Sequence, residues 1–576
     1  MQKLLQLIIA MMIVGYTSQA ETITVTDSWI NAGETKTMTA DNIYVLDRFV
    51  FVEDGAELWI EPGTVIQGKP GQESNASALI IARGGKIYAE GTPDKPIVFT
   101  FEGDDPNDDT DFPMEETGLW GGLIILGNAP TNNPESVRNI EGIPENNQLG
   151  KYGGNDPMDN SGVLRYVSIR HGGSDIGEGN EINGLTMGAV GAGTTIEYVE
   201  VLYNKDDGFE WFGGNVNTRY LVSAFNGDDA FDYDEGFNGM GQFWFSIQAA
   251  NRGNMAGEHD GGNKPDDSMP YAIPQIANVT FIGSGANSGN SKSMGIHFRD
   301  NAGGKYYNGI MTEQTSKGLD LEDLENGQDS ESRLSNGDLH LQNFIWWNIG
   351  SVEMPTLSDI APDVPDTESD GKIIKGYSLQ PIRTYLGNAG NGNKIQNPNL
   401  MSINRMADSW GLDPRPAQGP AWSGVKDLTD NGFHVQTDYI GAFGSGNWAV
   451  DWTALNTFNV ISTSGAYNPT TQALGPQSSV DWNGNTINTF ENNSRINLYP
   501  NPVEKQTTIE FELTKSTMVT MDVYDASGNK LENLVSKNMS LGNYGLTWTP
   551  NNLVSGAYFI QMTTNYGTFT QKVIVK

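Results

Sequence analysis

Two segments of the chain place paired aspartates among aromatic residues, 22 positions apart: YNKDDGFEWFGG (203–214) and FNGDDAFDYDEG (225–236). Asp206 aligns with Asp228, and Asp207 aligns with Asp229. Clustered carboxylates are suited to two kinds of chemistry, because they bind hard cations such as calcium and serve as general acid and base. These four aspartates are therefore the first candidates for a functional site.

The match extends to the residues around the aspartates, which suggests that each segment is one turn of a repeating structure. The further aligned pairs are Tyr198 with Tyr220, Tyr203 with Phe225, Asn204 with Asn226, Phe209 with Phe231, and Trp211 with Tyr233. About 22 residues fit one turn of a solenoid, whose rungs stack roughly 4.8 Å apart. Stacked aromatics would then fill the interior, and a ladder of Asn side chains would satisfy its own amides.

Stacking is unfavourable for the aspartates. Two ionised carboxylates about 5 Å apart repel by roughly 3 kcal/mol at an effective dielectric near 20. Solvent, a cation, backbone N–H groups or protonation must offset this repulsion. One interpretation makes the four aspartates turn residues that bond nearby backbone. A second makes them calcium ligands, to which Asp232, Asp234, Glu235 and the segment EHDGG (258–262) add oxygens.

A separate acidic segment, GDDPNDDTDFPMEE, provides a second calcium hypothesis. Positions 1, 3, 5, 7 and 12 of a calcium-loop pattern are occupied by Asp105, Asn107, Asp109, Asp111 and Glu116. Thr110 stands where the pattern needs a Gly for a sharp turn, and the flanks resemble strands rather than helices. A solvated acidic loop is the alternative.

Composition and the N-terminus indicate an exported protein. The chain begins MQKLLQLIIAMMIVGYTSQA, a basic residue and an apolar run followed by small residues, which predicts a signal peptide over 1–20 with cleavage between Ala20 and Glu21. No later segment is apolar for long enough to predict a transmembrane span in the mature chain. The absence of cysteine excludes disulfides, thiolate metal sites and thiol nucleophiles. A net charge of −37 disfavours nucleic acid and anionic membranes as partners and favours cations.

The rest of the chain supports an all-β solenoid. Short β-rich runs recur about every 20 residues, separated by Gly, Asn and Asp, without long helical periodicity. The phrases IEPGTVI (60–66) and AEGTPDKPIVFT (89–100) resemble those of secreted right-handed parallel β-helix proteins of the pectin-lyase-like class. The chain also resembles a Bacteroidetes family of exported β-helix proteins of unassigned function. We expect the β-helix domain over 21–457 and a linker rich in Asn, Thr, Ser and Gly over 458–494.

The last eighty or so residues change pattern. From 495 to 576, alternating apolar residues predict about seven short strands in a small immunoglobulin-like antiparallel β-sandwich. The segment resembles the C-terminal sorting domain of type IX secretion substrates. The matching landmarks are Leu498, Tyr499, Pro500, Asn501, Pro502, Gly556, Tyr558, Lys572 and Lys576. The resemblance implies passage through the periplasm, docking on the type IX translocon and sorting machinery, and release or attachment to surface lipopolysaccharide.

The β-helix resemblance also raises catalysis as a third interpretation of the acidic residues. Polysaccharide-cleaving β-helices use carboxylates on stacked rungs as acid and base, or as calcium ligands beside a basic residue. The catalytic candidates are Asp207, Asp229, His259, His297 and Arg299, with His171 as a further histidine to consider. Sugar-stacking candidates are Trp211, Tyr233 and Trp244, for which interior packing is the alternative.

Three functional hypotheses follow. The first is a secreted or outer-surface protein that binds glycans or other extracellular ligands, with calcium as its cofactor. The second is a polysaccharide lyase or glycoside hydrolase that uses the acidic face of 206–260. The third is a structural surface-layer protein or adhesin.

Overall fold

The computed structural model describes residues 20–464, apart from 178–179, 263–264, 266, 287, 326–327, 366, 370–371, 375 and 429–430. Beyond 464 it describes 479–480, 486–487, 497–499, 503, 505–513, 517–524, 530–539, 542–550, 553–554, 556–564 and 567–576. The expected signal peptide and most of the expected linker lie outside these ranges. The chain divides into two compact units, residues 1–426 with 438–467, and residues 427–437 with 468–576.

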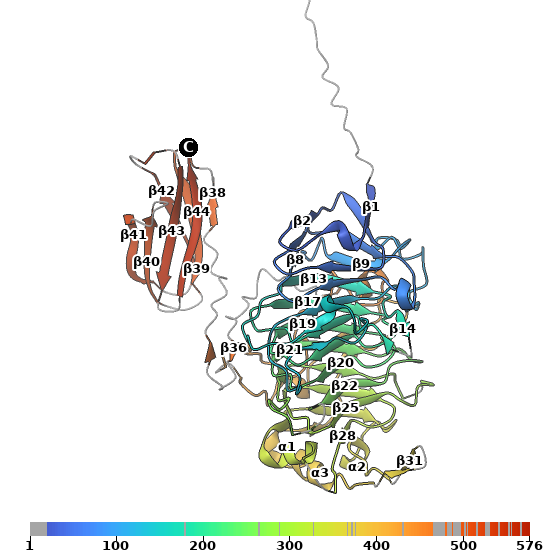
Figure 1. Ribbon diagram of the computed structural model, residues 1–576. Coiled ribbons are helices and arrows are strands. Elements are labelled where there is room, and N and C mark those ends of the chain that lie inside the picture. The colour runs from blue at the N-terminus through green and yellow to red at the C-terminus, as the bar shows by residue number, and fades with distance from the viewer. Residues whose placement is uncertain are drawn as a thin grey trace, which may run out of the picture. The chain divides into compact units, whose positions relative to one another are not determined.

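The first unit is a parallel β-helix, whose rungs follow one another along the coil (Figure 1). One wall is a nine-stranded sheet in which all pairs are parallel. Its strands, in spatial order, are β4 (Phe49–Val52), β7 (Ala78–Ile81), β10 (Leu123–Leu126), β16 (Leu185–Gly188), β18 (Phe209–Phe212), β20 (Phe231–Asp234), β22 (Met255–Asp260), β25 (Met294–Arg299) and β28 (Leu319–Leu321).

The predicted 22-residue repeat is confirmed in this sheet. Strand β18 pairs with β20 so that Phe209 lies beside Phe231 and Trp211 lies beside Tyr233. The rings of Phe209 and Phe231 stack with their centroids 5.5 Å apart. Each predicted segment is therefore one rung of the coil.

The remaining walls form an eighteen-stranded sheet that bends at a corner. Its strands are β1 (Glu21–Val25), β2 (Thr35–Met38), β3 (Asn42–Leu46), β5 (Glu57–Ile60), β6 (Val65–Gly68), β8 (Lys86–Glu90), β9 (Ile97–Phe101), β13 (Gly162–Arg170), β17 (Thr195–Leu202), β19 (Asn217–Ala224), β21 (Met240–Ile247), β23 (Gln275–Ala277), β24 (Thr280–Ile282), β26 (Gly304–Tyr307), β27 (Ile310–Gln314), β29 (Leu339–Gln342), β30 (Ile345–Ile349) and β33 (Lys394–Ile395). Strand β13, for example, pairs with both β8 and β9, one on each side of the bend.

A column of aromatic residues marks this corner. Tyr166, Tyr198, Tyr220 and Phe243 occupy it on successive rungs, each with a left-handed φ between 50° and 61°. Left-handed backbone is costly for residues with a Cβ. Neighbouring rings offset part of this cost, because the pair Tyr198 and Tyr220 stacks with centroids 4.3 Å apart. On later rungs Asn278, Asn308 and Asn343 take over the left-handed position, which suits Asn better.

Residues 438–461 form a strap that covers the corner column from outside. Trp452 meets the edge of Tyr198, with ring centroids 6.1 Å apart. The buried carboxylate of Glu200 accepts the backbone N–H groups of Ala454 and Leu455 at 2.6 and 3.3 Å, at the start of helix α4 (Ala454–Thr457). Burial raises the pKa of Glu200, and these donors stabilise its charged form. The strap ends at Ile461, which pairs with Leu412, the residue before the short strand β35 (Asp413–Pro416).

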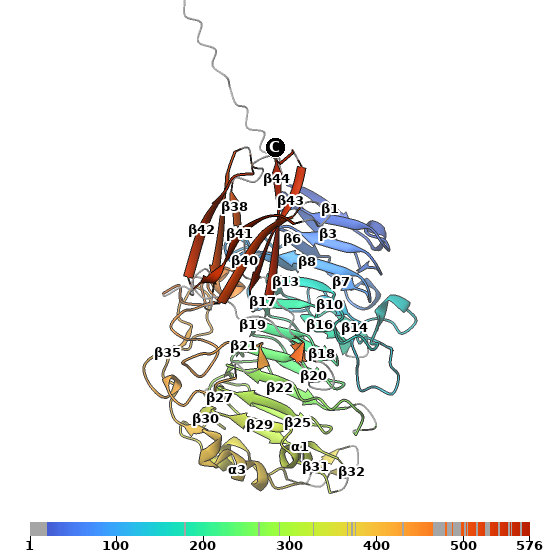
Figure 2. The same ribbon diagram turned by 90° about the vertical axis from the view of Figure 1, so that its left-hand side faces the viewer.

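Three short helices lie at the end of the coil farthest from β1 (Figure 1), and two of them, α1 and α3, are also labelled in Figure 2. They are α1 (Ser330–Asn336), α2 (Leu357–Ile360) and α3 (Gln380–Leu386). Ile360, Ile382 and Leu386 are buried in the same apolar core as the interior of the coil. The helices therefore close this end of the apolar interior. No described helix is long and apolar enough to cross a membrane.

Residues 497–576 of the second unit contain two antiparallel sheets among the described residues. One consists of β38 (Asn497–Tyr499), β39 (Thr507–Leu513) and β42 (Gly542–Trp548). The other consists of β40 (Thr517–Tyr524), β41 (Lys530–Met539), β43 (Gly556–Thr564) and β44 (Gly567–Val575). Residues from both sheets, such as Phe511 and Ile560, share one buried core. The predicted seven-stranded β-sandwich is thus confirmed.

Candidate functional site

The outer face of the nine-stranded sheet changes from apolar to acidic along the coil. On β7 and β10, side chains that alternate with the core residues are apolar, such as Ile80 and Ile124. On β18, β20 and β22 the outward positions are occupied by Glu210, Asp232, Asp234, Glu258 and Asp260, together with the apolar Phe212. Because side chains on a strand alternate between its two faces, stacking places these carboxylates in two adjacent columns.

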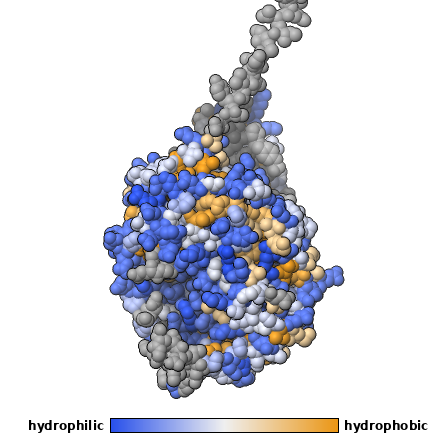
Figure 3. All heavy atoms as spheres, turned by 90° about the vertical axis from the view of Figure 1, so that its right-hand side faces the viewer, coloured by the Kyte–Doolittle hydropathy of each residue, from blue (hydrophilic) through white to orange (hydrophobic). Residues whose placement is uncertain are grey.

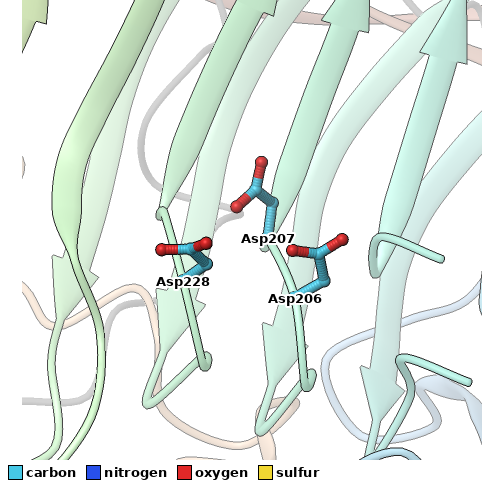
Figure 4. Close-up of side chains that lie close together, drawn as sticks. All are labelled: Asp206, Asp207 and Asp228. Atoms are coloured by element: carbon cyan, nitrogen blue, oxygen red, sulfur yellow. The ribbon is translucent and has the colours of Figure 1, made fainter. Parts of the chain in front are cut away.

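Two groups of three carboxylates converge at this face, and they share Asp207. In one group, oxygens of Asp206, Asp207 and Asp228 all lie within 4.8 Å of one another. In the other, oxygens of Asp207, Glu210 and Asp232 meet the same limit. Figure 4 shows the first group, with Asp206 and Asp207 on one rung and Asp228 on the next.

The turns before the strands fix the positions of Asp207 and Asp229. The backbone N–H of Asp229 donates to Oδ1 of Asp207 at 2.8 Å, and the N–H of Met255 donates to Oδ1 of Asp229 at 2.5 Å. One rung earlier, Oδ1 of Asn183 accepts the N–H of Asp207 at 3.3 Å. Each of these side chains therefore links its turn to the turn of the next rung. The interpretation as turn residues therefore explains the position of one oxygen of Asp207 and one oxygen of Asp229. It leaves the second oxygen of each side chain unexplained.

Burial and mutual repulsion make ionisation of the cluster unfavourable. Burial, followed by the charge of Asp228, raises the pKa of Asp206 to about 7. Burial raises the pKa of Asp207 well above its usual range, with Asp229 as the next cause. The pKa values of Glu210 and Asp232 are raised in the same way, first by burial and then by neighbouring carboxylates. Oδ1 of Asp232 is buried and has no hydrogen-bond partner among the described residues.

The acidic columns form part of the floor of an open groove of about 1260 Å³. The floor includes Glu210, Asp232, Asp234 and Asp260, and the opposite wall comes from residues 135–152. Arg299 lies at the groove, where its guanidinium donates two hydrogen bonds to Asp260, at 2.5 and 2.9 Å. The surface seen in Figure 3 is mostly hydrophilic, with apolar residues in small separate patches.

The chemistry of these donors fits calcium. Calcium takes six to eight oxygen ligands at about 2.3–2.6 Å and accepts irregular geometry. Three carboxylates whose oxygens lie within 4.8 Å of one another can contact one such ion. A cation would also offset the repulsion and the burial that raise the pKa values of Asp206 and Asp207.

Comparison with known families assigns the coil and the sandwich separately. Residues 30–395, more than half of the chain, match the family described as the pectate-lyase-like β-helix domain. The chain belongs to this family. Residues 497–576 match the secretion-system C-terminal sorting domain. A comparison with curated proteins gave no match.

This pectate-lyase-like β-helix protein thus carries a type IX sorting domain, as its C-terminal landmarks predicted. Leu498 and Tyr499 lie in β38, while Pro500, Asn501 and Pro502 fall outside the described residues. Gly556 and Tyr558 lie at the start of β43, and Lys572 lies in β44. Lys576 closes the chain, where its N–H donates to the carbonyl of Val503 at 2.9 Å. The sorting domain implies contact with the type IX machinery, and export to the cell surface or the medium.

The proposed sugar-stacking residues are core residues. Trp211, Tyr233 and Trp244 are fully buried inside the coil, where the rings of Trp211 and Trp244 stack with centroids 5.0 Å apart. A sugar has no access to these rings, so their assignment as ligand-binding residues was wrong. Their alternation on the strands points them inward, and this alternation was already visible in the sequence.

The histidines separate into interior and surface residues. His259 is fully buried and stacked on Tyr233, with its Nε2 2.7 Å from the hydroxyl of Tyr306, and burial lowers its pKa to about 3. His171 is also buried, with its Nδ1 2.8 Å from the carbonyl of Glu116 and its pKa lowered by burial to about 4. Both are uncharged packing residues, so the choice of His259 as a catalytic candidate was wrong. His297 points outward, with its Nε2 4.0 Å from Asp320.

The second calcium hypothesis finds less support. All of 105–116 is among the described residues. No three carboxylates of this described segment converge as Asp206, Asp207 and Asp228 do. Instead Asp111 accepts the backbone N–H of Asp105 at 2.7 Å, and Asp105 accepts from both the backbone and the side chain of Asn107. Asp109 accepts from Asn459 at 2.8 Å. The segment is an acidic loop held by its own turns and by Asn459.

Sequence reasoning overlooked Glu210 and the groove wall. The 22-residue alignment that pairs Trp211 with Tyr233 also pairs Glu210 with Asp232, one acid over another at an outward position. That match could have identified Glu210. The wall is formed by a segment far from the repeat in sequence, and nothing in its composition pointed to the acidic rungs.

Proposed function

We propose that this exported β-helix protein binds extracellular glycans in its acidic groove, and that calcium held by the shared carboxylates forms part of the binding surface. The observation that carries the proposal is the convergence of two carboxylate groups on Asp207, one of which contributes Glu210 and Asp232 to the lining of an open groove. Calcium bound to three carboxylates has coordination positions to spare, because it takes six to eight oxygens. Sugar hydroxyl or carboxylate oxygens can fill those positions.

The groove favours a polymer over a single sugar. Its lining residues extend from Phe49 on β4 to Arg299 on β25, seven rung steps along the nine-stranded sheet. At roughly 4.8 Å per step, this distance is about 34 Å. An extended chain of several sugar units matches a groove of this length, which runs along the axis of the coil.

The geometry supports binding better than catalysis. Asp207 and Asp229 each use one oxygen to accept a backbone N–H from the next rung, which restrains both side chains. Arg299 is held by Asp260 and also lies 3.2 Å from Glu258, so its guanidinium is neutralised rather than poised as a base. Detection of lyase or hydrolase activity would refute this proposal and show that the protein is an enzyme.

A glycan array tests the proposal directly. The full chain, without residues 1–20, should bind polymeric glycans in calcium, and EDTA should abolish binding. Asp207→Asn should lose the calcium-dependent signal, while Asp41→Asn, at an exposed position, should retain it. Release of soluble sugar from a bound polymer, abolished by Asp207→Asn, would show an enzyme instead. Equal binding in calcium and EDTA would contradict the role of calcium.

The route of export completes the proposal. We infer that a signal peptide over 1–20 directs the chain into the periplasm, and that the sorting domain then directs it across the outer membrane. The mature coil is then attached to surface lipopolysaccharide or released, and either form would expose the groove to extracellular glycans.

A further inference from the structure

The wall of the groove is an excursion of the chain between β10 and β13, residues 127–161. Its first arm crosses four rungs along the coil. The bonds that hold this arm are Ala129 N–H to the carbonyl of Ala189 (2.9 Å), Gly214 N–H to the carbonyl of Pro130 (3.0 Å), Asn132 N–H to the carbonyl of Glu235 (2.9 Å) and Asn132 Nδ2 to the carbonyl of Gly261 (2.6 Å). The chain then turns back through the paired strands β11 (Arg138–Asn139) and β12 (Lys151–Tyr152).

One buried carboxylate joins both arms of the excursion to the coil. Oε1 of Glu235 accepts from Arg138 Nη1 at 2.8 Å and from Asn133 Nδ2 at 3.0 Å. Its Oε2 accepts from the Tyr152 hydroxyl at 2.8 Å. Glu235 is only 1% exposed and stands just after β20, at the edge of the acidic floor. Three donors from the wall therefore meet on a single side chain of the floor.

Other contacts hold the excursion at places away from this edge. At its base, Asn128 donates to Asp159 at 3.0 Å and closes the loop. Its underside packs Ile140, Ile143 and Tyr152 on the apolar rungs of the sheet. These contacts lie at the base and over the apolar rungs, whereas Glu235 bonds the wall at the acidic rungs. At the acidic rungs the first arm is also held by its bonds to Gly214, to the carbonyl of Glu235 and to Gly261. The side chain of Glu235 therefore positions mainly the returning arm, with Arg138 and Tyr152, beside the acidic floor.

We propose that Glu235 is a positioning residue that fixes the wall over the acidic floor, sets the width of the groove, and so determines which glycans fit. This inference rests on the proposed function, since it assigns specificity to the same groove. Hydrogen bonds to a charged group each contribute about 1.5–3 kcal/mol, and a buried partner left without its bond adds a further penalty. Loss of the carboxylate would leave Arg138 and Tyr152 without their acceptor and allow the wall to open.

Hydrogen exchange and glycan binding together test the inference in the full chain. In Glu235→Ala, backbone amides of 133–152 should exchange at least about tenfold faster than in wild type, as expected for the loss of such bonds. The range of polymers retained on a glycan array in calcium should widen. Glu235→Gln keeps an acceptor for Arg138 and should restore most of the protection, whereas Tyr152→Phe should give a smaller increase. Glu102→Ala, at an exposed position, is the matched control and should change neither readout.

The two proposals fail in different ways. Unchanged exchange over 133–152 in Glu235→Ala would overturn the role of Glu235, because the apolar underside and the bonds of the first arm would then suffice to hold the wall. An unchanged glycan profile with faster exchange would overturn its role in specificity. If wild-type protein binds no glycan but the exchange differences appear, the proposed function fails while the wall contact stands. If Glu235→Ala does not fold, Glu235→Gln and Tyr152→Phe provide the same comparison.

Discussion

Replacing Asp207 by Asn should make the protein more stable without calcium and unresponsive to calcium. The substitution removes one charge but keeps Oδ1, which accepts the N–H of Asp229. Oxygens of Asp206, Asp207 and Asp228 lie within 4.8 Å of one another. At that separation and an effective dielectric near 20, each ionised pair repels by about 3.5 kcal/mol. The variant therefore loses repulsion and loses a calcium ligand, but it does not lose its turn.

Thermal unfolding at pH 8 separates these effects. Unfolding entropy near 2.1 cal/mol/K per residue, over about 440 residues of the coil, converts 3.5 kcal/mol into roughly 4 °C. Asp207→Asn should therefore melt about 4 °C above wild type in EDTA for each repelling pair that the substitution removes. Calcium at about a hundred times its Kd contributes about 2.7 kcal/mol, or roughly 3 °C, to wild type and little to the variant. Asp41→Asn, an exposed control, should behave as wild type in both conditions.

The sign of the change in EDTA is the decisive result. If Asp207 served only as a turn residue, Asn would match wild type or melt below it in EDTA, and calcium would affect neither protein. Such a result would refute the argument that repulsion within the cluster is relieved by a cation. A higher melting temperature in EDTA together with loss of the calcium response would support it.

Three further predictions concern pH, the strap and secretion. Because the pKa values of Asp206 and Asp234 are raised to about 7 in the fold, the folded state binds protons more tightly than the unfolded chain above pH 4. Stability in EDTA should therefore fall between about pH 4 and pH 7, and calcium should reduce that fall, as differential scanning calorimetry can show. Glu200→Gln should destabilise the coil by about 3 kcal/mol, because Arg170 loses its buried counter-charge and the strap loses its ionised acceptor. Urea unfolding measures this loss of stability, with Glu102→Gln as the exposed control. Deletion of 495–576 should keep the protein off the cell surface and out of the medium, and normal delivery in a fractionation assay would contradict the sorting role.

The sequence was sufficient to predict the coil because a solenoid repeats its local pattern. The match of Phe209 with Phe231 and Trp211 with Tyr233 predicted both the rung length and the stacking found in the structure. Alternation within β18 also separated inward from outward side chains. The same information should have placed Trp211 in the interior, and the hypothesis of a sugar platform overlooked that alternation.

The site was only partly predictable because its other half comes from distant parts of the chain. Asp206, Asp207 and Asp228 meet as the repeat implied, since stacking fixes their separation. The contact between Glu235 and Arg138 joins residues 97 positions apart, and no periodicity relates them. The burial of His259 likewise depends on Tyr306, which belongs to another wall of the coil. Such contacts follow from packing between segments, which a local pattern does not encode.

The two faces of the coil treat buried charge differently, and this contrast argues that the acidic cluster is functional. On β17, the buried Glu197 lies near Arg165 and Arg219, at 3.3 and 3.8 Å, and the charge of Arg170 stabilises that of Glu200 under the strap. Buried ions are tolerated there because each sign has a counterpart. At the groove, the nearest charges to Asp207 are other carboxylates, which raise its pKa further. Even at the groove, Glu235 and Asp260 are paired with Arg138 and Arg299. The like charges around Asp207 are therefore better explained by a bound cation than by the needs of the fold.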